Sequence, residues 1–162
     1  MKLGILSDTH NQVQRTQHAV ELLVNAGAQV LVHCGDLASP EVVAVCSVLP
    51  CYFVFGNHDA DVVPELEHAA RQYGVTCLGW GGEIELAGKR IGISHGHLAR
   101  EMRPLRAARP DYLLSGHSHA AIDWDNDGIR CINPGALHRA NPWTVALLDL
   151  QTDQLTEFEI TR

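Results

Sequence analysis

Five short polar clusters in this 162-residue chain combine aspartate, asparagine and histidine, the residue types that bind divalent metal ions. The clusters are Asp8-Thr9-His10, Gly35-Asp36, Gly56-Asn57-His58-Asp59, Ser94-His95-Gly96-His97 and Gly116-His117-Ser118-His119. Calcium takes mostly oxygen ligands, so a mixture of oxygen and imidazole favours manganese, iron, zinc, cobalt or nickel. One such cluster alone is usually a turn or a helix cap. Five in one chain are difficult to explain in that way, and we interpret them together as a metal site.

The number of ligands indicates more than one ion. The clusters supply about seven Asp, Asn and His groups, more than one tetrahedral ion uses, and a bridging carboxylate would let them hold two ions with room for water. Two divalent ions about 3.5–4 Å apart serve in-line phosphoryl displacement. They would bring about +4 charges against about −2 from Asp8 and Asp36, so the centre would attract phosphate. We expect manganese, with nickel, iron, zinc, cobalt and magnesium as alternatives, and a small phosphoester as substrate.

The elements that must position these clusters alternate in the first half of the chain. Apolar runs at residues 3–7, 29–34 and 51–55 predict strands, and helical spacing predicts helices at 13–25, 40–48 and 64–73. This order predicts βαβ units and a largely parallel sheet. Each of the three strands ends at a polar cluster, as do strands predicted at 90–94 and 112–114. Ligands bind at the carboxyl ends of such strands, so we expect the clusters to converge there.

The pattern changes in the second half. Strands are predicted at 83–86, 90–94, 112–114, 120–124, 129–132, 144–148 and 155–160, with hairpin turns at Gly88 and at 126–128. One helix is predicted at 99–108, made irregular by Pro104. We therefore expect this half to be mainly antiparallel. The predicted fold class is α/β, with two packed mixed β-sheets flanked by helices in one domain over residues 1–162.

Two pairs of candidate ligands are two residues apart: Asp8 with His10, and His117 with His119. In an extended strand that spacing puts both side chains on the same side, so we expect each pair to face the metal site together. The glycines beside the clusters, Gly35, Gly56, Gly96 and Gly116, are expected to let the backbone turn sharply.

Composition excludes some functions. The net charge is −7 and no Lys/Arg-rich run occurs, which argues against a nucleic-acid groove, although bound cations could still attract an anionic substrate. No signal peptide is visible, and no apolar run approaches the roughly 20 residues of a membrane span. The five cysteines are scattered without a Cys-x-x-Cys pair, as expected of buried thiols. We expect a cytoplasmic protein without a membrane partner, and a homo-oligomer is compatible with the sequence.

In type and order, the clusters resemble the signature of the calcineurin-like metallophosphoesterases: Asp-x-His, Gly-Asp, Gly-Asn-His-Asp/Glu, His and Gly-His-x-His. The short chain and Asn133-Pro134-Gly135 also look like the compact subfamily of small bacterial and archaeal phosphodiesterases. The retromer subunit vacuolar protein sorting protein 29 is similar to that subfamily in fold. The resemblance implies a four-layer metallophosphoesterase sandwich.

The resemblance also implies roles for the residues. Asp8, His10 and His119 would hold one ion, Asn57, His95 and His117 the other, and Asp36 would bridge them. A hydroxide between the ions would attack phosphorus. His58 would donate a proton to the leaving group or stabilise its charge, without binding metal. Independently of the resemblance, His97 follows His95 by two residues, so we expect it to contact substrate or metal, or to hydrogen-bond to a ligand.

Some residues have simpler interpretations or remain open. Larger family members often carry Asp and Arg after the Gly-Asp motif, whereas Leu37-Ala38-Ser39-Pro40 stands here, so Asp59 or Asp61 are the candidates left to orient His58. His33 is expected to pack in the core, and the tryptophans to serve packing. His138 and Arg139 could border the site. The segment 123–128 imitates a calcium loop, but Pro134 stands where that loop needs Glu, so a hairpin turn is expected.

Three functions compete. The favoured one is a metal-dependent phosphodiesterase or phosphatase, because every ligand position and His58 are present. The alternative is a non-catalytic protein-binding scaffold on the same fold, which an exposed apolar patch away from the metal site would support. A zinc hydrolase of amides or esters is less favoured, since no His-Glu-x-x-His motif occurs.

Overall fold

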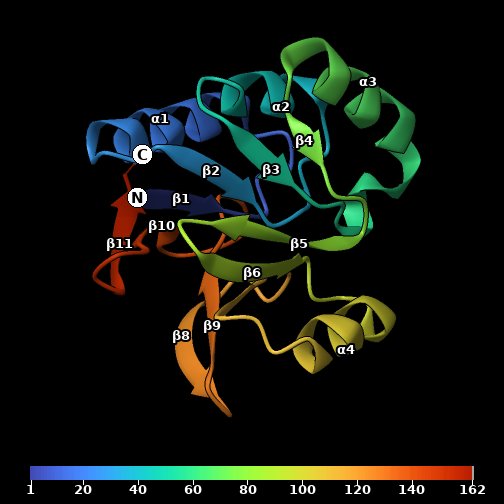
Figure 1. Ribbon diagram of the computed structural model, residues 1–162. Coiled ribbons are helices and arrows are strands. Elements are labelled where there is room, and N and C mark those ends of the chain that lie inside the picture. The colour runs from blue at the N-terminus through green and yellow to red at the C-terminus, as the bar shows by residue number, and fades with distance from the viewer. Residues whose placement is uncertain (162) are drawn as a thin grey trace.

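Two β-sheets face each other in the computed structural model, which describes residues 1–161. The first sheet has the strand order β11-β10-β1-β2-β3-β4 and the second the order β5-β6-β7-β9-β8. Helices α1, α2 and α3 cover the first sheet, and α4 lies on the far side of the second (Figure 1). The predicted α/β fold of two packed mixed sheets flanked by helices is therefore confirmed.

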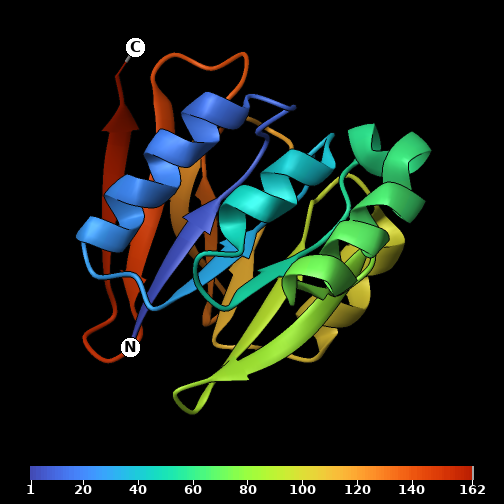
Figure 2. The same ribbon diagram turned by 90° about the horizontal axis from the view of Figure 1, so that it is seen from above.

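The first sheet contains the predicted βαβ units. Its parallel part is β1 (Lys2–Leu6), β2 (Val30–His33), β3 (Cys51–Phe53) and β4 (Thr76–Cys77). The helices that connect these strands are α1 (Val13–Asn25), α2 (Pro40–Cys46) and α3 (Val63–Tyr73), and they lie side by side over the sheet (Figure 2). The last two strands, β10 (Trp143–Asp149) and β11 (Gln154–Ile160), extend the sheet antiparallel beyond β1. Chain segments from both ends of the sequence thus share one sheet.

The second sheet is antiparallel at its edges and parallel at its centre. Its strands are β5 (Gly81–Leu86), β6 (Lys89–Ser94), β7 (Tyr112–Leu114), β8 (Ala121–Asn126) and β9 (Ile129–Pro134). Both hairpin turns are confirmed, at Ala87-Gly88 and Asp127-Gly128, and all four residues have positive φ. The expectation of a mainly antiparallel second half was wrong for β7, which pairs in parallel with β6 and β9. The crossover through α4 (Ala99–Ala107) between β6 and β7 makes this pairing parallel.

Three apolar cores separate the four layers, and alternation along the strands fills them. Ile5 and Val32 point between the sheets, whereas Leu6 and Leu31 point toward the helices above the first sheet. On the other side of the molecule, Leu113 packs in the third core with α4 residues. Strands buried on both faces explain why their sequences read as continuous apolar runs.

Two elements were not predicted from the sequence. The two-residue strand β4 is too short to show a period, and the 3₁₀ helix η1 (Asn57–Val62) is polar throughout most of its length. The other elements begin or end within two residues of the predicted bounds. Within residues 1–161, none of the helices is both long and apolar enough for a membrane crossing.

Candidate metal centre

All five polar clusters meet at one edge of the two sheets. The loops after β1 and β2 are joined by hydrogen bonds from the Asp8 amide to the Gly35 carbonyl (3.0 Å) and from the His10 amide to the Asp36 carbonyl (2.9 Å). In the second sheet, the Gly116 amide donates to the His95 carbonyl (3.1 Å). The convergence that parallel strand ends predict is therefore observed.

The backbone of the candidate ligands is not extended. Five of the seven have positive φ: Asp8 (53°), His10 (43°), Asp36 (59°), His117 (69°) and His119 (59°). The expectation that Asp8 with His10 and His117 with His119 share a strand face was wrong, because β1 and β7 end before these residues. Left-handed residues other than glycine are strained and cluster at functional sites. Tight turns, rather than strand alternation, direct these side chains inward.

Two carboxylates lie among the imidazoles. The Nε2 atom of His119 is 3.1 Å from Oδ1 of Asp8. Oδ2 of Asp36 is 3.3 Å from Nε2 of His10 and 3.4 Å from Nε2 of His95. Asp36 therefore stands between two imidazoles, while Asp8 adjoins a third.

Hydrogen bonds fix which atoms of these ligands face the centre. Oδ2 of Asp8 accepts from the Ser7 hydroxyl (2.6 Å) and the His117 amide (3.0 Å), which leaves Oδ1 for the centre. Oδ1 of Asp36 accepts from the His58 amide (2.8 Å), which leaves Oδ2. Nδ1–H of His95 donates to the Cys34 carbonyl (2.8 Å), so its Nε2 carries the free lone pair.

The donor atoms fit a metal ion. Among the described residues, Oδ1 of Asp8, Nε2 of His10 and Nε2 of His95 are buried without a hydrogen-bond partner. Asp8 and Asp36 are 0% and 1% exposed. Buried carboxylates and unpaired polar atoms are costly unless a cation satisfies them. Donor atoms within 4.8 Å of one another form three overlapping groups: Asp8 with His10 and His119, His10 with Asp36 and His58, and Asp8 with Asp36 and His95.

Charge coupling in the centre follows from this geometry. Burial raises the pKa of Asp36, but the contacts with His95 and the His58 amide outweigh it and lower that pKa to about 2. Burial opposes the charge on His95, yet the Asp36 and Asp8 carboxylates raise its pKa. Protons and metal ions would therefore compete for the same imidazole.

The remaining predicted residues lie at the rim. The exposed His117 ring is 5.1 Å from the His95 ring, and the exposed His58 ring is 4.8 Å from the His10 ring, measured between centroids. Asn57 begins η1 beside His58, and its side chain makes no hydrogen bond within the described part of the chain. His58, His10 and Asp36 offer possible ligand atoms within 4.8 Å of one another, so the position of His58 is compatible with metal ligation as well as with catalysis.

Two further histidines flank the centre. His97 lies 5.2 Å from His95 and 5.9 Å from Trp80 between ring centroids, on the side of His117. The His138 ring lies 4.7 Å from the His10 ring between centroids, on the side of His58. His138 therefore borders the candidate site, as the sequence suggested. His33 is fully buried, as expected.

Sequence reasoning missed residues that hold the loops. Asp59 does not orient the His58 ring; its carboxylate accepts from the amides of Asp36 (2.9 Å), Ala38 (2.7 Å) and Gly56 (2.8 Å). Asn133 donates to the Gly116 carbonyl (2.8 Å), which fixes the loop of His117. Their polar side chains beside the motifs were the available signal, but apart from Gly56 their partners are far away in sequence.

Gly56 and Gly116 are required by close packing rather than by turning. A Cβ atom on Gly56 would lie 2.1 Å from Oδ1 of Asp36, and one on Gly116 would lie 1.9 Å from the Ser7 hydroxyl. Neither glycine has positive φ. The expectation of sharp turns was therefore wrong for these two residues, whose missing side chains make room for the carboxylates and their partners.

Known proteins resemble the chain over almost its whole length. The model of the calcineurin-like phosphoesterase superfamily domain matches residues 1–153. Phosphodiesterase MJ0936 from Methanocaldococcus jannaschii is 24% identical over 162 residues, covering 97% of this chain and 98% of that protein. Phosphodiesterase YfcE from Escherichia coli K12 is 29% identical over 167 residues, covering 92% of this chain and 88% of that protein.

Solved structures share the fold. A structure described as that of a novel archaeal phosphodiesterase superposes with a TM-score of 0.87 at 24% identity, covering 98% of this chain and 99% of the other. A single mutant of Vps29 from Entamoeba histolytica superposes with a TM-score of 0.67 at 18% identity, covering 99% and 100%. The expected resemblance to compact phosphodiesterases and to Vps29 is thus confirmed. The chain belongs to the calcineurin-like phosphoesterase superfamily.

Proposed function

We propose that this protein is a metal-dependent phosphoesterase that hydrolyses phosphodiesters in preference to monoesters, with two divalent ions. One observation carries the proposal: two buried carboxylates are surrounded by imidazoles whose free nitrogens point at them. The relatives with 24% and 29% identity are also named phosphodiesterases. Manganese is the ion that we favour.

The distances support a division of the ligands into two sets. Asp8, His10 and His119 would hold one ion, because the Asp8 carboxylate adjoins His119. Asn57, His95 and His117 would hold the other. Asp36 would be shared, and this is supported by its Oδ2 atom, which lies between His10 and His95.

The ions and the surrounding side chains would then have separate roles in hydrolysis. When bound, the ions would neutralise phosphate charge and lower the pKa of a coordinated water. Water would add to phosphorus, the ester P–O bond would break, and a phosphomonoester and an alcohol would form. His58, exposed beside His10, would give the alcohol oxygen its proton. His97, on the opposite side of the centre, would position a phosphate oxygen or the retained ester group.

Hydrolysis of paired model substrates tests this proposal. The protein would be stripped of metal, given manganese, nickel, magnesium or zinc in turn, and assayed with bis(p-nitrophenyl) phosphate and p-nitrophenyl phosphate. We expect metal-restored cleavage that favours the diester. Preference for the monoester would overturn the phosphodiesterase assignment. Failure with every metal, despite two bound ions, would overturn the enzymatic proposal.

One observation favours the scaffold alternative. Ile122 and Trp124 on the edge strand β8 are 42% and 48% exposed. Exposed apolar side chains that share one face of a strand are a common feature of protein-binding surfaces. A protein that binds two ions and cleaves no phosphoester would be assigned this function instead.

A further inference from the structure

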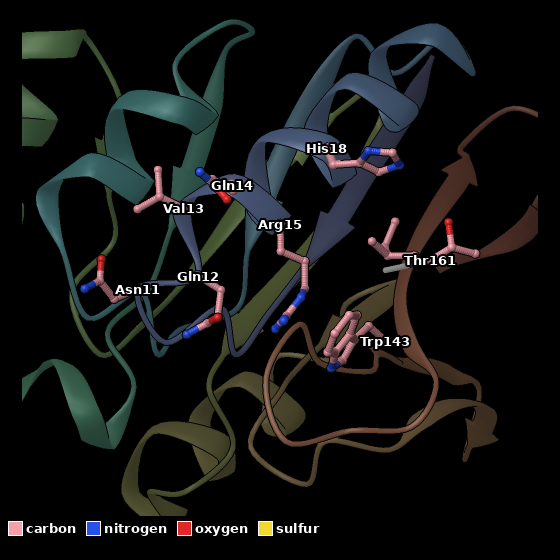
Figure 3. Close-up of a pocket in the computed structure, with 9 residues that line it drawn as sticks. Asn11, Gln12, Val13, Gln14, Arg15, His18, Trp143 and Thr161 are labelled. Carbon is pink, nitrogen blue, oxygen red and sulfur yellow. The ribbon is translucent and has the colours of Figure 1, made fainter.

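Two surface features lie outside the ligand set of the metal centre. The first is a groove of about 810 Å³ between α1 and Trp143. Figure 3 shows the Arg15 side chain reaching from α1 toward the indole of Trp143, and its guanidinium carbon lies 3.3 Å from the ring centroid. One face of that indole is thus already covered from within the chain. The second feature, the outer edge of strand β8, has no such cover.

β8 is the last strand of the second sheet, and among the described residues no strand pairs with its outer edge (Figure 1). Residues 120–125 are all exposed, and the large apolar side chains of Ile122 and Trp124 are 42% and 48% exposed. Trp124 lies opposite Cys131, which packs in the core beneath α4, so both side chains are on the α4 face of the sheet. An exposed edge strand with apolar side chains is the kind that pairs with another strand.

Hydrogen bonds of β9 show which backbone groups of β8 are free. The amide of Arg130 and the carbonyl of Ile132 bond to residues that flank β7, at 3.1 and 3.0 Å, and therefore not to β8. These two residues lie opposite Asp125 and Asp123. Because bonding alternates along an antiparallel ladder, Asp123, Asp125 and also Ala121 direct their N–H and C=O groups at the open edge.

We propose that β8 pairs antiparallel with β8 of a second copy of this chain, about a two-fold axis at Asp123. Asp123 then faces Asp123 of the second copy, and Ala121 faces Asp125 of the second copy. All three residues with free backbone groups thereby become hydrogen-bonded pairs, and the second sheets of two molecules join into one. This interaction surface does not depend on the proposed hydrolysis.

The apolar side chains of β8 are self-complementary in this register. Ile122 lies directly opposite Trp124 of the second copy, once on each side of the axis. These are the non-hydrogen-bonded positions, where facing side chains are closest. The four apolar side chains therefore cover one another on the α4 face. An axis at Ile122 would instead leave Trp124 opposite Ala120.

The charges of the other face are compatible with the same axis. The one like-charge pair is Asp123 with its copy, and each of these carboxylates is held by Nε and Nη2 of Arg130 in its own chain, at 2.9 and 2.8 Å. Asp125 faces the uncharged Ala121. An axis at Trp124 would place Asp123 opposite Asp125 twice, and like charges directly opposite each other are destabilising.

Sedimentation velocity of the metal-free full chain, from micromolar to millimolar concentration, tests the pairing. We expect a concentration-dependent equilibrium between monomer and dimer. Ile122→Lys removes both Ile–Trp pairs and should raise the dissociation constant about tenfold or more. Val48→Lys adds the same charge at a valine that is 62% exposed at the end of α2, and it should leave the constant unchanged. A chain that stays monomeric, or equal constants in all three proteins, would overturn the inference.

Oxidative cross-linking tests the register. The Cα atoms of a hydrogen-bonded antiparallel pair are about 5.5 Å apart, within the range of a disulfide, so Asp123→Cys should give a covalent dimer on mild oxidation. Asp125→Cys is the matched control, because it lies on the same face of β8 but its copy lies at the other end of the paired strands. Electrophoresis without reductant measures both variants. A covalent dimer of neither variant, or of both to the same extent, would overturn the axis at Asp123.

Discussion

Asp8 and Asp36 each divide their two oxygens between the fold and the metal centre. One oxygen of each accepts hydrogen bonds from neighbouring amides or a hydroxyl, and the other faces the imidazoles. The two ring nitrogens of His95 also differ in this way: Nδ1 is hydrogen-bonded to a backbone carbonyl, and Nε2 has no hydrogen-bond partner among the described residues. Hydrogen bonds therefore orient these three side chains toward the centre, so an ion would bind there with little rearrangement.

His58 is the residue whose role is most open to test. We expect His58→Ala to lower kcat by about 10²–10⁴-fold, because a positioned proton donor contributes that much. Both ions should remain bound, as measured by elemental analysis of the dialysed protein. His68→Ala, an exposed histidine of α3, serves as the control and should change neither quantity. Loss of one ion in the His58 variant would instead indicate that His58 is a ligand. Its position allows this, because His10, Asp36 and His58 offer donor atoms within 4.8 Å of one another.

At the scale of elements, the loops after β1, β2 and β3 are held to one another rather than to the strands alone. The carboxylate of Asp59 in η1 gathers three backbone amides from two loops. Asn133 at the end of β9 does the same for the loop after β7. These side chains fix the spacing between loops that carry different ligands.

Replacement of the Asp59 carboxylate should therefore destabilise the fold. In Asp59→Asn, an amide N–H₂ group would face backbone N–H groups of Asp36, Gly56 or Ala38 where an acceptor is needed. We expect the free energy of unfolding to fall by about 2–4 kcal/mol, since hydrogen bonds to charged groups contribute more than neutral ones. Urea unfolding of the metal-free protein measures this. Asp61→Asn, in the same turn but exposed, should change it by less than about 0.5 kcal/mol; equal effects would remove the special role of Asp59.

For the whole molecule, the packing of two sheets and four helices buries polar groups as well as apolar ones. His33 is 0% exposed at the end of β2, where Nδ1 accepts from the Gly35 amide (3.2 Å) and Nε2 bonds to the Thr9 hydroxyl (3.0 Å). Because Nδ1 is an acceptor, the ring is neutral. Burial, followed by the charge of His95, lowers the pKa of His33 from 6.5 to about 3.

This pKa makes the fold sensitive to acid. The unfolded chain binds a proton at His33 below about pH 6.5, whereas the folded chain does so only near pH 3, so stability falls as pH decreases through this window. Between about pH 7 and pH 5 the loss from this residue is about 2 kcal/mol. His33→Gln cannot take up that proton, so the variant should lose about 2 kcal/mol less than the parent over that interval, as urea unfolding at both pH values would measure. Equal losses in the two proteins would show that His33 is not responsible.

The sequence by itself determined the class of fold and the composition of the centre. Apolar runs and helical spacing placed α1, α3, β6 and β7 within two residues, because strands buried on both faces and helices buried on one leave clear periods. The motifs from Asp8 to His119 predicted that the candidate metal ligands would lie together, since each motif follows a strand and parallel strand ends meet. The hairpins of the second half were also predicted correctly, from the turn residues at Gly88 and at 126–128.

Only the tertiary structure decided how these residues are oriented. The left-handed backbone of Asp8, Asp36 and His117 depends on hydrogen bonds between loops that are distant in sequence, which no local pattern encodes. For the same reason the roles of Asp59 and Asn133 appear only in the folded chain, as does the parallel pairing of β7. The groove between α1 and Trp143 joins residues over 120 positions apart. Spacing along a chain fixes which groups reach one edge, but contacts between chain-distant loops fix where each group points.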